Sequence, residues 1–250
     1  EYLEPQFDIF EVQAPPPGVD IVAVVDGSGY MSDNWDALYS SLPSLMNGIS
    51  DLGSTWRFTT ISADPDRVIP QAWIDPSVAN LEWATIGQFQ YVQALAGQDE
   101  TGLDASFAYA LNFPNELVEE NDLYFIFISD EDDQSNITPV AWKDLFSRFK
   151  LNATSKVYSG FIGETGGECG DDLGANYLLV ADATVDLCET DYSPILAPLN
   201  ARVTPVLDTF TLEAIPEISS LSVYINGIET DQWTYNSDSN DVYISAAIPL

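Results

Sequence analysis

Oxygen-bearing side chains follow an apolar run near the start of the chain. Residues 19–25 are almost wholly aliphatic, and Asp26 and Ser28 come directly after them with glycines in between. Carboxylate and hydroxyl oxygens are the ligands that Mg²⁺ and Ca²⁺ prefer in proteins. Open α/β sheets bind ligands beyond the carboxyl ends of their strands. A buried strand that ends in Asp-Gly-Ser-Gly therefore predicts a divalent-cation site.

A second apolar run ends in the same way. Residues 122–128 lead into Ser129 and Asp130. Earlier in the chain, a Gly-flanked polar loop at residues 97–102 opens an expected helix. Strands and helices alternate along this part of the chain, which predicts a doubly wound sheet with a site above its carboxyl edge. Three segments are expected to converge there: residues 26–30, 98–101 and 129–133.

The elements that position these segments follow from hydrophobic periodicity and turn residues. Unbroken apolar runs predict central parallel strands covered on both faces. The expected strands are residues 19–25, 56–62, 122–130, 156–162 and a strand-like stretch at 177–187. The expected helices are residues 33–52, 78–95, 103–111, 138–149 and 191–201. This order predicts the α/β class, with a mostly parallel, doubly wound sheet flanked by helices.

Three parts are expected along the chain. Residues 1–18 form an N-terminal arm that ends in a Pro-rich break, residues 19–203 form the main domain, and residues 204–250 form a small antiparallel β-rich extension. Alternating apolar and polar residues mark the extension, and Asn226-Gly227 predicts a tight hairpin. Because about forty residues are few for an independent domain, the extension is expected to pack on the main domain, pair with the arm, or continue beyond Leu250.

Two motifs resemble a von Willebrand factor A domain over residues 19–201. The run Val-Asp-Ile-Val-Ala-Val-Val-Asp-Gly-Ser-Gly-Tyr-Met-Ser resembles the first strand and metal loop of that family, and Ile-Phe-Ile-Ser-Asp-Glu-Asp-Asp resembles its later acidic strand end. The resemblance implies a metal-ion-dependent adhesion site for Mg²⁺ or Ca²⁺. Asp26 and Ser28 would be ligands from the first loop, and Asp130 would bind directly or through water. Asp99 or Thr101 would lie where the family often supplies threonine.

The fifth position of the first motif departs from the family pattern. The family has Asp-x-Ser-Gly-Ser, whereas this chain has Tyr30 in place of the second serine. A phenol lies several bonds farther from the backbone than a serine hydroxyl, so it cannot take the same ligand position without a different loop path. Either water or Asp99 fills this position, or the cation binds weakly.

The charge balance narrows the possible partners. Forty acidic residues oppose seven Lys and Arg, which gives a formal net charge of −33, and there is no histidine. Such a field repels nucleic acids and anionic lipid head groups. The lack of histidine excludes Ser-His-Asp catalysis and histidine-ligated zinc. No signal peptide or membrane span is visible, and some processing is expected before Glu1.

The two cysteines suggest a disulfide. Eighteen residues separate Cys169 from Cys188, and closing such a loop is worth roughly 3 kcal/mol by chain-entropy arguments. The bridge would place the protein in an oxidising compartment, whereas two buried free thiols are the alternative.

These features lead to one function and two rivals. The leading hypothesis is a non-enzymatic binding, adhesion or assembly module of an extracellular, cell-surface or virion complex, in which an acidic residue of a protein partner completes the metal shell. The first rival is a purely structural coat, appendage or virion component without a functional metal site. The second is a metal-dependent hydrolase, although no base or nucleophile stands out.

Overall fold

A five-stranded parallel sheet forms the centre of the larger part of the protein. The computed structural model describes residues 7–10, 17–52, 55–95, 100–150, 155–166, 173–201, 209–225 and 227–244. The strands are β1 (Val19–Val25), β2 (Trp56–Ser62), β3 (Asp122–Ser129), β4 (Val157–Gly163) and β5 (Ala183–Asp186). Their order is β2-β1-β3-β4-β5, and every neighbouring pair is parallel. The predicted doubly wound α/β fold is confirmed.

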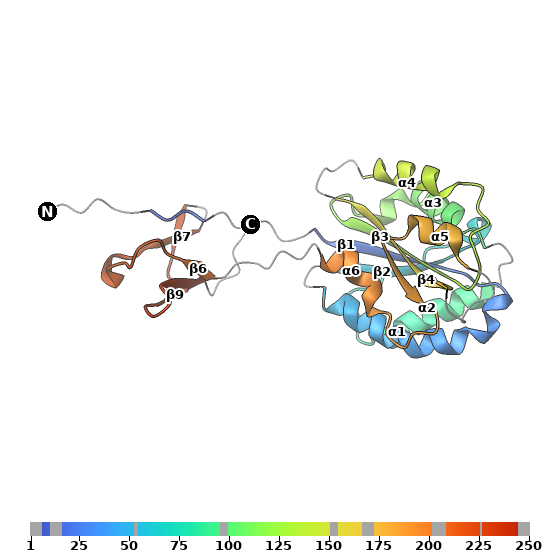
Figure 1. Ribbon diagram of the computed structural model, residues 1–250, viewed down its shortest axis with the longest axis horizontal. Helices are drawn as coiled ribbons and strands as arrows, with labels where there is room; N and C mark the ends of the chain where they lie inside the picture. Colours follow the sequence, from blue (N-terminus) through green and yellow to red (C-terminus); the bar gives the residue numbers. More distant parts are fainter. Residues whose placement is uncertain are drawn as a thin grey trace. The chain divides into compact units, whose positions relative to one another are not determined.

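Helices cover both faces of this sheet (Figure 1). One face packs against α1 (Trp35–Ser50) and α2 (Leu81–Leu95), together with the 3₁₀ turn η4 (Ser193–Leu196) and α6 (Ala197–Asn200). The other face packs against α3 (Gly102–Asn112), α4 (Pro139–Ser147) and α5 (Ala175–Val180). Because both faces are covered, all seven residues of β1 are buried, as expected for a central parallel strand.

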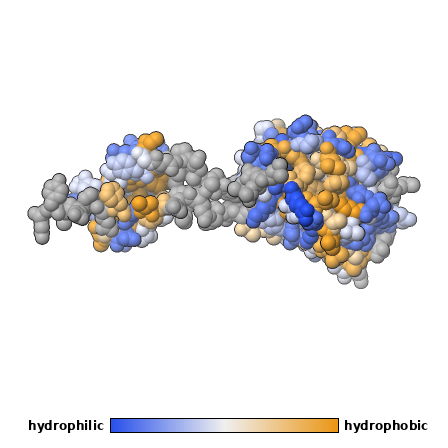
Figure 2. Space-filling model, turned by 90° about the horizontal axis from the view of Figure 1, so that it is seen from above, coloured by the Kyte–Doolittle hydropathy of each residue, from blue (hydrophilic) through white to orange (hydrophobic). Residues whose placement is uncertain are grey.

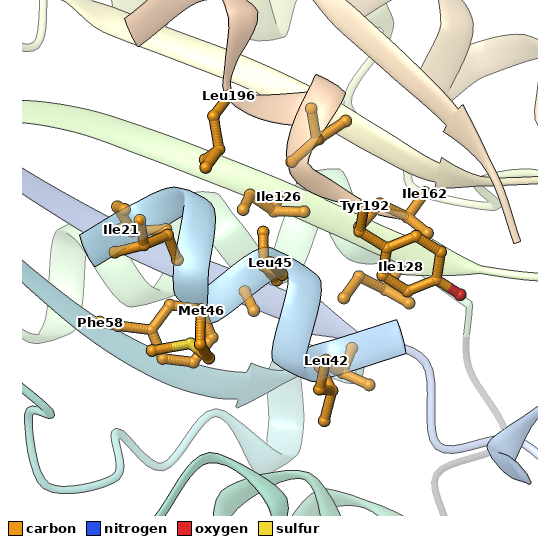
Figure 3. Close-up of a cluster of buried hydrophobic side chains, with 14 of the residues drawn as sticks. Ile21, Leu42, Leu45, Met46, Phe58, Ile126, Ile128, Ile162, Tyr192 and Leu196 are labelled. Carbon is orange, nitrogen blue, oxygen red and sulfur yellow. The ribbon is translucent and has the colours of Figure 1, made fainter. Parts of the chain in front are cut away.

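Alternate residues of each strand enter two separate cores. Ile21 of β1 and Ile126 of β3 belong to the core beneath α1, whereas Val22 and Phe125 belong to the core beneath α3 and α4. The helix α1 contributes Leu38, Leu42, Leu45, Met46 and Ile49 to the first core, at the three- and four-residue spacing of an amphipathic helix. Figure 3 shows Leu42, Leu45 and Met46 over the strands. Each such side chain contributes about 1.5–3 kcal/mol when fully buried.

The segment predicted as strand-like at residues 177–187 is partly wrong. Tyr177 and Val180 lie in α5, and β5 begins only at Ala183. Both side chains are buried in the same core, and a spacing of three residues places them on one face of a helix. The helix predicted at 191–201 consists of η4 followed by the four residues of α6.

Short antiparallel strands form a second unit. The strands β6 (Thr209–Thr211), β10 (Asp241–Ile244) and β9 (Trp233–Asn236) make one sheet, and β7 (Val223–Ile225) pairs with β8 (Ile228–Thr230). The β7–β8 turn contains Gly227 with a φ of 81°, a conformation that glycine adopts without strain. The predicted antiparallel extension and its hairpin are therefore present, although no long alternating run of residues marks β8 or β9 in the sequence.

The N-terminal segment belongs to this second unit. The backbone N–H of Glu213 donates to Asp8 at 3.0 Å, and the rings of Phe10 and Phe210 lie 5.1 Å apart. Contacts divide the chain into one unit of Glu1–Pro15 with Thr204–Leu250 and another of Pro16–Val203. These contacts correspond to one of the three arrangements expected for the extension, in which it pairs with the N-terminal arm.

A network of charged groups holds the amino edge of the parallel sheet. Asp20 is fully buried in β1 and accepts hydrogen bonds from Arg57 at 3.0 Å, from the Val118 N–H at 2.7 Å and from Asn121 at 2.7 Å. The Arg57 guanidinium also lies over the Trp73 ring at 4.2 Å. Buried charges are tolerated only when paired and hydrogen-bonded, and Asp20 meets both conditions.

The surface carries apolar side chains among many charged ones. Leu111, Val140 and Leu179 of α3, α4 and α5 are largely exposed, and Figure 2 shows apolar areas interspersed with hydrophilic ones on the larger unit. None of the helices within the described residues is both long and apolar enough to span a membrane.

Candidate functional site at the carboxyl edge of the sheet

The predicted site lies at the point where the strand order reverses. The chain passes from β1 to β2 on one side, and β3 then pairs with β1 on the other side. Asp26 follows β1 and Asp130 follows β3, and the Asp26 N–H donates to the Ile128 carbonyl at 2.8 Å. Doubly wound sheets bind ligands at such a switch point. The two acids predicted from strand ends are therefore at the same edge.

Two hydrogen bonds fix the carboxylate of Asp26. Its Oδ1 accepts from the Ser28 N–H at 2.7 Å, and its Oδ2 accepts from the Ser129 hydroxyl at 2.8 Å. Burial raises the pKa of Asp26, and the bonds from Ser28 and Ser129 partly offset the rise, because they stabilise the charged form. The carboxylate is thus held in one orientation at the end of β1.

The hydroxyl of Ser28 is buried beside this carboxylate. Ser28 is 6% exposed, and its Oγ has no hydrogen-bond partner within the part of the chain that the structure describes. The same side chain lies close enough to Asp26 to lower the pKa of that carboxyl. A buried polar atom without a partner costs about 1–3 kcal/mol, so it is a feature that requires an explanation.

Tyr30 takes no part in this cluster of oxygens. It begins the 3₁₀ turn η1 (Tyr30–Asp33), and its side chain is 62% exposed. The phenol therefore lies largely in solvent instead of occupying the position of the family's second serine. This outcome agrees with the steric argument from the sequence.

Asp130 is buried and bonded to the residue before α1. Its Oδ2 accepts from the side-chain amide of Asn34 at 2.9 Å. Thr101 lies just before α3, and its hydroxyl donates to the Ala63 carbonyl at 3.3 Å. Ala63 in turn bonds to Val25 at the end of β1, so Thr101 lies at the same edge. Asp99 lies outside the described residues.

Glu100 is a member of the site that the sequence did not single out. It is 4% exposed and accepts from the Gln134 side chain at 2.5 Å. Burial, then the charge of Asp26 and contact with Glu131, raise the pKa of Glu100 to about 8. A buried acid next to other acids holds its proton more tightly because the second charge is costly. In the sequence, Glu100 lies between Asp99 and Thr101 in a loop expected at the site, and this position could have indicated it.

The second half of the acidic run after β3 bonds to the first turns of two helices. Asp132 accepts from the Asn176 N–H at 2.7 Å, and Asp133 accepts from the Leu103 N–H at 3.1 Å. These bonds satisfy free N–H groups in the first turns of α5 and α3, as N-terminal capping side chains do. Asp132 and Asp133 therefore stabilise helices, whereas Asp130 and Glu131 are the residues nearest the strand end.

The donor set fits a hard divalent cation. Asp26 and Asp130 supply carboxylate oxygens and Ser28 supplies a hydroxyl that lacks a partner among the described residues; all are ligands that Mg²⁺ and Ca²⁺ accept. The described residues contain no group of three or more His, Cys, Asp or Glu arranged to hold a metal ion. The described part of the predicted set contains only two acids, and its remaining oxygens come from hydroxyl groups.

The predicted disulfide involves one residue outside the described part of the chain. Cys169 lies there, whereas Cys188 follows β5 and donates its N–H to Asp186 at 3.1 Å. The described residues include no free cysteine. The bridge between Cys169 and Cys188 stays a prediction.

Comparison with known proteins yields structural matches only. No protein-family model and no curated protein sequence matches the chain. Among solved structures, proximal thread matrix protein 1 from the mussel byssus aligns over 75% of this chain and 45% of its own, with 13% identity and a TM-score of 0.44. The manganese-loaded TRAP protein of Plasmodium vivax aligns over 75% of both chains, with 16% identity and a TM-score of 0.47.

A third match is the pilus adhesin SpaC from Lactobacillus rhamnosus GG. It aligns over 78% of this chain, with 16% identity and a TM-score of 0.45. The alignment spans 31% of the adhesin. The chain thus matches less than half the length of both the mussel protein and the adhesin.

Proposed function

We propose that the protein is a non-enzymatic binding and assembly module of the von Willebrand factor A type, with a divalent cation bound at the carboxyl edge of its sheet. The observation that carries the proposal is the buried hydroxyl of Ser28 beside Asp26, which has no hydrogen-bond partner among the residues that the structure describes. A cation there would take an oxygen ligand from Ser28 and neutralise part of the charge of Asp26 and Asp130. The cation would be Mg²⁺ or Ca²⁺.

The site favours binding over catalysis. Asp26 receives two hydrogen bonds that fix it as a carboxylate acceptor, and Asp130 receives one from Asn34. Catalytic hydrolysis would need a base or nucleophile positioned beside the ion, and the chain has no histidine. A cation with a position open to solvent would instead accept an oxygen ligand, such as an acidic side chain, from a protein partner outside the cytoplasm.

Calorimetric titration tests the proposal. The EDTA-treated protein is titrated with MgCl₂ and CaCl₂, and one saturable site is expected. Ser28→Ala should weaken binding by about 10-fold or more, since it removes a ligand while sparing both acids. Ser40→Ala on α1, whose exposed hydroxyl donates to the Ala37 carbonyl, should bind like the parent protein. The absence of any binding by the parent protein would exclude the cation site.

One observation favours the structural rival. The exposed Tyr30 leaves the first loop with one hydroxyl ligand where the family pattern supplies two. If the rival holds, the chain assembles through other surfaces, and EDTA will leave its association with partners unchanged.

A further inference from the structure

The hairpin of β7 and β8 has an exposed outer face in the smaller unit. Val223 and Ile225 of β7 pack against the small apolar core of this unit. Successive residues of a strand point to opposite faces, so Tyr224 points away from that core. Its side chain is 59% exposed, and Glu229 of β8 is exposed as well. An aromatic ring and a carboxylate are thus both open to solvent on this hairpin.

Tyr224 and Glu229 lie directly opposite each other in the two strands. The strand register pairs Tyr224 with Glu229, and the side chains of such a pair lie on one face with Cβ atoms about 5 Å apart. A tyrosine ring attracts a cation over its face, and a carboxylate forms an ion pair with the same group. The pair therefore offers two contacts to one arginine or lysine side chain.

The smaller unit has no cation of its own for this place. Residues 1–15 and 204–250 contain acids but no Lys or Arg, and exposed acids, Glu217 and Asp231, stand on either side of the hairpin in the sequence. A second copy of the chain has a formal net charge of −33 and would oppose like charge to like charge, which disfavours association. Charge complementarity therefore selects a basic partner.

The hairpin also has open strand edges. The sheet of β7 and β8 has two strands among the described residues, so each strand has an edge where N–H and C=O groups face away from its neighbour. An extended peptide can add to such an edge, and a two-stranded sheet is marginally stable until further strands or packing support it. Ile228 of β8 is 75% exposed and adds an apolar contact. These features fit an extended segment that carries basic and apolar residues.

We propose that the β7–β8 hairpin binds an extended basic segment of a partner protein, with an arginine or lysine of that segment placed on Tyr224 and Glu229. This surface belongs to the smaller unit, whereas the cation site belongs to the larger one. Binding at the hairpin therefore requires no metal ion. It gives the module a second point of attachment in an assembly.

A short capped peptide of alternating arginine and valine is the probe. It is titrated into the ¹⁵N-labelled full chain in EDTA, and the largest amide shifts are expected in residues 223–225 and 228–230. The same peptide with citrulline in place of arginine has a similar shape without the charge, and it should bind about 10-fold more weakly. Equal binding of the two peptides, or shifts only outside the hairpin, would overturn the proposal.

Glu229→Gln and Asp238→Asn form a matched pair of variants. Each removes one exposed charge from the smaller unit, but Asp238 lies in the turn between β9 and β10. Glu229→Gln and Tyr224→Leu should each weaken binding of the arginine peptide by about threefold, and the two changes together by about 10-fold. Asp238→Asn should weaken it by less than about twofold. Equal losses in Glu229→Gln and Asp238→Asn would show a general attraction to the acidic surface and contradict the assignment.

The outcomes separate this inference from the proposed function. The titration contains EDTA, so failure of the cation site leaves its result unchanged. The comparison of the two peptides uses the parent protein, so it decides the question even if a variant fails to fold. A dimer in sedimentation of the parent protein, with hairpin amide shifts that change on dilution, would assign this face to a second copy and overturn the proposal.

Discussion

The hydroxyl of Ser129 donates to Oδ2 of Asp26 at 2.8 Å and so joins the ends of two adjacent strands. Ser129→Ala would leave the buried Asp26 carboxylate with one donor fewer. The free energy of unfolding should fall by about 1–3 kcal/mol, and the pKa of Asp26 should rise further because one stabilising bond is lost. Urea denaturation and NMR titration of the carboxyl carbon measure the two effects.

Ser147→Ala is the control for this prediction. The Ser147 hydroxyl is exposed and bonds within α4 to the Asp144 carbonyl. Its removal should leave stability within about 0.5 kcal/mol of the parent protein. A similar effect for both serines would mean that the bond between Ser129 and Asp26 has no special role in stability.

The amino edge of the sheet should depend on Arg57. Arg57→Met would remove the only cation that pairs with the fully buried Asp20 among the described residues, at an expected cost of about 3 kcal/mol in the free energy of unfolding. Arg148→Met breaks the exposed pair with Asp144 and should cost less than about 1 kcal/mol. Thermal or urea unfolding distinguishes the two, and equal costs would contradict a structural role for the Asp20 network.

Stability of the metal-free protein should depend on pH through Glu100. Its pKa is 4.5 as a free side chain and about 8 in the folded protein, so the folded state keeps a proton that the unfolded chain loses. The contribution of Glu100 to the free energy of unfolding is therefore fully present below a pH of about 4.5 and is lost as the pH rises through about 8. Relative to Glu100→Gln, the parent protein should therefore become less stable between those values.

The stability difference between the two proteins isolates this group from the many other acids. In urea denaturation with EDTA, the free energy of unfolding of the parent protein should fall steadily relative to that of Glu100→Gln as the pH rises across that range. A difference that stays constant with pH would mean that Glu100 is not held in a proton-binding environment.

The predicted bridge between Cys169 and Cys188 can be tested by peptide mass mapping without reductant. A linked peptide pair is expected, and reduction should lower the free energy of unfolding by about 3 kcal/mol through the loop that it opens. If the bridge is present, Cys188→Ser should match the reduced protein in stability. Two free thiols in the native protein would refute the bridge.

The sequence predicted the parallel sheet well because its strands have strong signals. Residues 19–25 and 122–129 are long apolar runs that end in acids, and α1 repeats apolar residues over 16 positions. Such windows are long enough to show a period. The strands β8 and β9 have three and four residues, which is too short for alternation to be distinguished from an irregular polar segment.

The site was predicted only in part for a different reason. Asp26, Ser28 and Asp130 stand at strand ends, where local sequence determines position. Glu100 accepts a hydrogen bond from Gln134, and its pKa is raised by its burial and by the charge of Asp26, and both residues are far away in the chain. The donation from Asn34 to Asp130 spans 96 positions. No local pattern reports such contacts, because tertiary packing alone creates them.

The central claim is that a cation binds between the ends of β1 and β3. Crystals grown with MnCl₂ test it most directly, because Mn²⁺ substitutes for Mg²⁺ at oxygen sites and its anomalous scattering locates the ion. The account predicts one strong anomalous peak within coordination distance of Asp26, Ser28 and Asp130. The absence of a peak at this edge in fully loaded crystals, or a peak only elsewhere on the acidic surface, would contradict it.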